Sequence, residues 1–182
     1  MKLETLLSQR EPHILKRWME CILDTYPEDA RRFLEKQKDP FSNPVGSTLS
    51  RAIETFYREF LGTGDPEKLA GSLDALIRVR AVQGFSASSA VGFLFSLKKI
   101  IREETRKEAR DNRISEEDLV FFESRLDEAA LAGFDLYMRC REKIYEIRAR
   151  ESRNQVSGLL RRAGLASEIA AWGAAENKKD LT

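Results

Sequence analysis

Two arginines and a glutamine, Arg78, Arg80 and Gln83, have types and spacing that suit the binding of a small ligand. Arg78 and Arg80 alternate with Ile77 and Ala81 in a segment of helical periodicity. Because a helix turns by about 100° per residue, at least one of the arginines is expected near the buried face. A guanidinium group so close to a core is expected to pair with a carboxylate or with an anionic ligand. Two interpretations stay open: internal ion pairs or stems that reach the surface, and a small anionic-ligand site.

His13 is the only histidine, and it lies beside Pro12 in the first turn of a predicted helix. A haem ligand has to lie deep in a fold, so we predict a surface or capping role for His13. Cys21 and Cys140 fall on or near apolar stripes, which favours buried thiols over a redox switch that needs an exposed thiolate. These residues predict no metal site and no cofactor.

The carboxylates and glycines do not form the patterns typical of an enzyme. Glu103-Glu104 and Glu116-Glu117-Asp118 lie within charged runs, where carboxylates face solvent. Gly62-Thr63-Gly64 lacks the following lysine and the preceding strand of a phosphate-binding loop. We therefore predict a non-enzymatic protein.

The charge balance argues against a nucleic-acid partner. The chain has 31 basic and 30 acidic side chains and a net charge of +1, so no global field attracts a polyanion. Residues 139–162 are locally basic but match no recognised nucleic-acid-binding motif, which favours a solvated or partner-binding helix. No apolar run has the length of a signal peptide or a membrane span, so we predict a cytoplasmic protein without membrane insertion.

Helical periodicity dominates the chain and predicts an all-α fold. Asn43-Pro44 and Asp65-Pro66 each read as a capping residue followed by a first-turn proline, and Ser115 as a further cap. Gly62-Thr63-Gly64 and Gly84-Phe85-Ser86 predict breaks between helices. These signals indicate a bundle of six to seven helices.

The last helix is predicted to be unusually long, from Ser115 to Arg162. Its apolar stripe becomes polar after Ile147, so we expect a bundle of residues 1–148, followed by a projecting helix end and tail in residues 149–182. Exposed Ile144, Tyr145 and Ile147 offer an apolar surface for a second helix, which predicts a homodimer. A monomer with a bent or frayed helix is the alternative.

A shorter apolar pattern lies in the tail. Leu165, Ile169 and Trp172 are spaced so that a helix would present them on one face. Leaving them in water would forgo roughly 1.5–3 kcal/mol each. We therefore expect the tail to dock on the bundle or on a partner, with a frayed tail as the alternative.

Several segments carry recognisable turn and packing signatures: Leu15-Lys16-Arg17-Trp18, Tyr26-Pro27, Lys38-Asp39-Pro40-Phe41-Ser42-Asn43-Pro44-Val45-Gly46, Ile77-Arg78-Val79-Arg80-Ala81-Val82-Gln83 and Leu97-Lys98-Lys99-Ile100-Ile101-Arg102-Glu103-Glu104. Together they resemble the N-terminal sensor domain of the RsbT co-antagonist (RsbRD-type) proteins of bacterial stress signalling. The resemblance covers roughly residues 5–150.

The resemblance implies a helical, globin-like sensor that signals through its last helix, which lies beside its mate in a dimer. Family members carry a phosphorylatable STAS output domain that binds a kinase, and here only residues 149–182 follow the bundle. We therefore predict a sensor or adaptor that lacks the STAS output and acts through contacts with a protein partner. The alternative function is a small anionic-ligand-binding domain that uses Arg78, Arg80 and Gln83.

Overall fold

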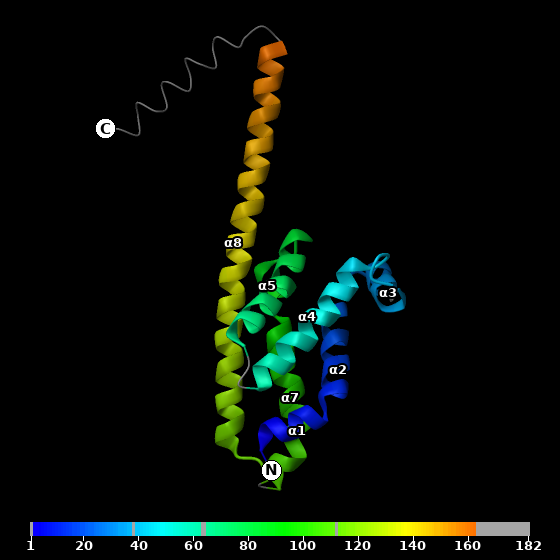
Figure 1. The fold of residues 1–182 in the computed structure, drawn as a ribbon, viewed down its shortest axis with the longest axis vertical. Helices are drawn as coiled ribbons and strands as arrows, with labels where there is room; N and C mark the ends of the chain where they lie inside the picture. The colour runs from blue at the N-terminus through cyan, green and yellow to red at the C-terminus, as the bar shows by residue number, and fades with distance from the viewer. Residues whose placement is uncertain (1, 38, 63–64, 112, 163–182) are drawn as a thin grey trace, which may run out of the picture. The chain divides into compact units, whose positions relative to one another are not determined.

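The computed structural model describes residues 2–37, 39–62, 65–111 and 113–162. Within these ranges the chain forms α-helices and no β-strand, which confirms the predicted all-α class. No helix of the described ranges combines the length and the apolarity that crossing a membrane requires. The helices are α1 (Leu3–Gln9), α2 (Glu11–Leu23), α3 (Glu28–Lys36), α4 (Pro44–Leu61), α5 (Pro66–Val82), α6 (Ala87–Val91), α7 (Phe93–Arg110) and α8 (Glu116–Arg162) (Figure 1).

The contacts divide the chain into two units, Met1–Cys140 and Arg141–Thr182. The first unit holds α1 to α7 and the beginning of α8. The described part of the second unit, residues 141–162, is helical and has no buried side chain. The long final helix expected from the sequence is confirmed, because α8 is one helix of 47 residues.

Three of the predicted helix starts are confirmed by their caps. Asn43 Oδ1 accepts a hydrogen bond from the Gly46 amide at 2.8 Å, and Asp65 Oδ1 accepts one from the Glu67 amide at 2.9 Å. Ser115 Oγ accepts from the Glu117 amide at 3.1 Å at the start of α8. Each side chain satisfies an amide that has no partner inside its helix.

The described residues contain eight helices, against the six to seven expected, because the apolar pattern of the sequence does not reveal two short helices. α1 precedes the first stripe that the sequence shows clearly. α6 and α7 read as one helix in the sequence, but Gly92 separates them. A Cβ atom at this glycine would lie 2.8 Å from the Ser88 carbonyl oxygen, so the chain passes too closely here for a side chain.

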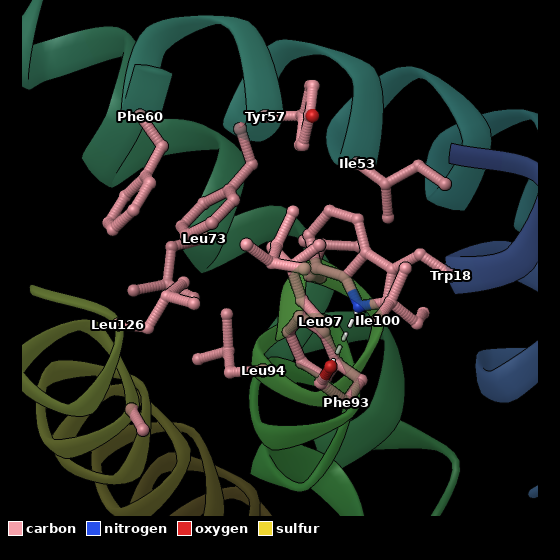
Figure 2. Close-up of a cluster of buried hydrophobic side chains, with 14 of the residues drawn as sticks. Trp18, Ile53, Tyr57, Phe60, Leu73, Phe93, Leu94, Leu97, Ile100 and Leu126 are labelled. Atoms are coloured by element: carbon pink, nitrogen blue, oxygen red, sulfur yellow. Dashed lines mark hydrogen bonds between the residues drawn. The ribbon is translucent and has the colours of Figure 1, made fainter. Parts of the chain in front are cut away.

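Trp18 lies at the centre of the core of the first unit, fully buried on α2 (Figure 2). Its ring centroid is 5.8 Å from those of Phe56 on α4 and Phe93 on α7. The indole Nε1 donates a hydrogen bond of 2.7 Å to the Phe93 carbonyl (Figure 2). One side chain therefore joins three helices through both its apolar surface and its polar atom.

Two helix pairs, α4 with α5 and α2 with α7, make the most extensive contacts of the first unit. The first part of α8 packs on this assembly through Phe122, whose ring meets Phe60 edge-on at 5.1 Å. An ion pair of 2.9 Å between Lys98 on α7 and Asp127 on α8 also joins these two helices.

We predict that Trp18→Ala lowers the free energy of unfolding by about 3–5 kcal/mol, because it removes a buried indole and leaves a cavity. Chemical denaturation followed by circular dichroism measures the change. Trp18→Phe should lose clearly less, since it keeps most of the apolar contact. A loss below about 1 kcal/mol for Trp18→Ala would contradict the central role of this side chain.

The two caps of α4 and α5 allow a matched comparison. Asn43 is 3% exposed and also donates to the carbonyls of Leu34 and Gln37, whereas Asp65 is exposed. We predict a loss of about 2–3 kcal/mol in unfolding free energy for Asn43→Ala and about 1 kcal/mol for Asp65→Ala. Equal losses in urea denaturation would show that the buried carbonyls do not depend on Asn43.

Candidate functional site

The end of α5 folds back on itself and covers Arg80. Gly84 has a φ of 81°, a conformation that costs glycine little. The Phe85 amide donates to the Arg80 carbonyl at 3.2 Å, and the Gly84 amide donates to the Ala81 carbonyl at 3.2 Å. This pair of bonds is the Schellman arrangement that ends many helices. It places Phe85 directly over the last turn of α5.

The Arg80 side chain is 0% exposed and is surrounded by aromatic rings. Its Cζ lies 4.4 Å from the ring centroid of Phe85, and 5.8 and 5.9 Å from those of Tyr26 and Phe93. Nη2 donates to Thr25 Oγ1 at 2.8 Å and to the Ser89 carbonyl at 2.9 Å. Arg80 therefore links the end of α2, the end of α5 and α6.

The rest of the Arg80 guanidinium is unpaired within the described part of the chain. Nε and Nη1 are buried and have no hydrogen-bond partner among the described residues, and no carboxylate of these residues pairs with the group. Burial lowers the pKa of Arg80 because desolvation penalises the charged form. A buried donor without a partner costs about 1–3 kcal/mol, and a cation over an aromatic ring returns up to about 2 kcal/mol. The rings contact the faces of the guanidinium and leave the N–H groups of Nε and Nη1 unsatisfied.

The other two predicted site residues lie at the surface. Arg78 is exposed and pairs with Asp74, one turn earlier on α5, at 2.9 Å. Gln83 is exposed as well, and its Oε1 accepts a hydrogen bond of 2.8 Å from the Tyr26 hydroxyl. Tyr26 thus contacts both Gln83 and Arg80, whereas Arg78 belongs to a separate ion pair.

The residues that surround Arg80 were not predicted from the sequence. Thr25 and Tyr26 directly follow α2, Phe85 lies in the turn after α5, and Ser89 belongs to α6. In the sequence, Tyr26-Pro27 is recognisable only as a turn signature and Gly84-Phe85-Ser86 only as a break between helices. Aromatic residues within two such boundaries were the available signal, but only the fold brings the boundaries together.

His13 belongs to an ion-pair network between α2 and α7. Its Nε2 lies 3.2 Å from Glu104 Oε1, and the same oxygen accepts a bond of 2.6 Å from Arg17. A hydrogen bond from Arg17 also lowers the pKa of the Glu103 carboxyl. Exposed Glu103 and half-buried Arg17 make this network a bridge at the surface that holds the two helices together.

The two cysteines are partly buried against the core, and burial raises the pKa of the Cys21 thiol. A raised pKa lowers the thiolate fraction that redox chemistry requires. Across the described residues, no three histidine, cysteine or acidic side chains are grouped so that they could hold a metal ion.

The first part of α8 has a second apolar face beside the one that meets the core. Leu119, Phe122, Leu126, Ala130 and Tyr137 are buried, whereas Val120, Leu131, Phe134 and Met138 are exposed. The exposed set follows spacings of 11, three and four residues, so it lies along one line about 100° around the helix from the buried set. We call Val120, Leu131, Phe134 and Met138 the lateral stripe of α8.

The partner-binding residues predicted from the sequence lie further along the chain. Tyr145 and Ile147 are exposed, with 56% and 47% of their surface accessible, and Ile144 is partly exposed. Leu165, Ile169 and Trp172 of the expected docking tail lie outside the described residues. The lateral stripe was not among the predicted residues, although its helical spacing is visible in the sequence.

The comparisons with known proteins agree with the resemblance found in the sequence. Residues 12–152 match the family described as the RsbT co-antagonist protein rsbRD N-terminal domain, a family of signalling domains. Neither a curated protein nor a solved structure shows significant similarity to the chain. Since the match covers most of the 182 residues, the chain belongs to the RsbRD N-terminal domain family.

Proposed function

We propose that this signalling domain is a cytoplasmic sensor or adaptor that acts through protein contacts and works as a homodimer, with α8 as the contact helix. The observation that carries the proposal is the lateral stripe. Leu131 is 71% exposed, Phe134 45% and Met138 41%, although large apolar side chains gain roughly 1.5–3 kcal/mol each on burial.

A second copy of the chain is the partner that the stripe fits best. Leu131, Met138 and Tyr145 are spaced by seven residues, the repeat with which helices pair side by side. A two-fold axis brings the same surface of both copies together, so an apolar stripe meets its own equivalent. In the RsbRD-type proteins, too, the last helix of the sensor lies beside its mate.

The helical residues 141–162 support the same interpretation. No side chain in this segment is buried, although most helices in proteins depend on a packed apolar face. Tyr145, Ile147, Val156 and Leu159 are exposed, and a partner helix would give them a surface to pack on.

We predict that the protein is a dimer at micromolar concentration and that the double substitution Leu131→Gln with Phe134→Gln weakens the dimer at least about 100-fold. A dimer that loses these side chains gives up about 3 kcal/mol or more, and each factor of ten corresponds to about 1.4 kcal/mol. Sedimentation equilibrium measures the association, and circular dichroism verifies that helix content is unchanged.

Phe41 provides the matched control, because it is 96% exposed but lies in the loop before α4. Phe41→Gln should leave the dimer intact. A version that ends at residue 142 shows how much Ile144, Tyr145 and Ile147 add. The proposal fails if the wild-type protein is a monomer in this range, or if the double variant associates as tightly as the Phe41 variant.

A further inference from the structure

We propose that the buried guanidinium of Arg80 binds a small monovalent anion, either a halide or a carboxylate of one or two carbons. The inference goes beyond the proposed dimer and does not require it. It begins from the unpaired edge of the side chain: Nη2 is held by Thr25 and Ser89, whereas Nε and Nη1 are buried without a partner in the described residues.

The missing partner has to carry negative charge. A guanidinium stays protonated in proteins, and no carboxylate of the described residues pairs with this one. Phe85 and its neighbouring rings contact the faces of the group but cannot accept from its in-plane N–H groups. A water molecule would accept these hydrogen bonds but leave the charge uncompensated. An anion would accept the hydrogen bonds and also compensate the charge.

The enclosure limits the ligand to a few atoms. Nε and Nη1 are shielded from solvent, so any anion has to displace neighbouring groups to reach them, and a nucleotide or another large anion would require a far larger displacement than a small one. The site nevertheless lies directly below the surface, because Thr25 and Ser89, whose oxygens hold Nη2, are both exposed. An ion can therefore reach Arg80 through a small displacement of α6, which is five residues long.

The site is also connected to α8 within the first unit. The ring of Phe85 stacks on the guanidinium, and the carbonyl of the same residue accepts a hydrogen bond of 2.7 Å from the Tyr137 hydroxyl. An anion that changes the position of Phe85 thus changes a contact made by the helix to which the partner surface is assigned.

Thermal unfolding at constant ionic strength tests the proposal. Sodium gluconate supplies an anion too bulky for the site, and sodium chloride or sodium formate replaces it. We expect a saturating small anion to raise the melting temperature of the wild-type protein by about 5 °C or more. A rise with chloride alone identifies a halide site, and a rise with formate alone identifies a carboxylate site.

Two methionine variants show whether Arg80 is responsible. Arg80→Met should lose the anion-dependent rise and should be at least as stable as the wild type in gluconate, because the uncompensated charge is gone. Arg78→Met, on the same helix and exposed, should keep the full rise. Equal melting temperatures of the wild type in all three salts, or an equal rise in Arg80→Met, would overturn the proposal.

Crystals of the wild-type protein provide a measurement that does not depend on the folding of a variant. Grown in bromide or in formate, they should show the anion beside Nε or Nη1 of Arg80, with bromide recognised by its anomalous scattering. A water molecule at this position under both conditions would refute the assignment.

Discussion

The contact between Trp18 and Phe93 organises the first unit, because it joins the core to the candidate site. The Trp18 indole donates to the carbonyl of the first residue of α7, while its ring packs between α4 and α7. The ring of Phe93 in turn faces the guanidinium of Arg80. A change in the packing of α2 against α7 would therefore alter the surroundings of Arg80 through the ring of Phe93.

The surroundings of Arg80 show how a helix end can hold a charge inside a protein. The positive φ of Gly84 reverses the chain, the Schellman bonds hold the reversal, and Phe85 closes over the guanidinium. The aromatic faces offset part of the desolvation cost, and Thr25 and Ser89 orient the group. The arrangement keeps a cation inside the protein with Nε and Nη1 unpartnered among the described residues.

The final helix serves two packing surfaces at once. Its buried set of side chains completes the core through contacts such as Phe122 on Phe60, and its lateral stripe leaves a second apolar surface without a partner in the described residues. Tyr137 connects the first of these surfaces with the turn that covers Arg80. The helix thus has one face toward the core and one toward solvent, in a chain that belongs to a family of signalling domains.

The sequence by itself determined the helical class, the starts of α4, α5 and α8, and the length of α8, because caps and apolar periodicity act within one helix. It also indicated that at least one of Arg78 and Arg80 lies near the core, since both stand among apolar neighbours on a helix. Only the tertiary structure decided that Arg78 turns to the surface, that Gln83 bonds with Tyr26, and that Arg80 meets rings instead of a carboxylate. The physical reason is distance along the chain: Thr25 and Arg80 are 55 residues apart, and no local pattern records which side chains meet when α2 packs beside the end of α5.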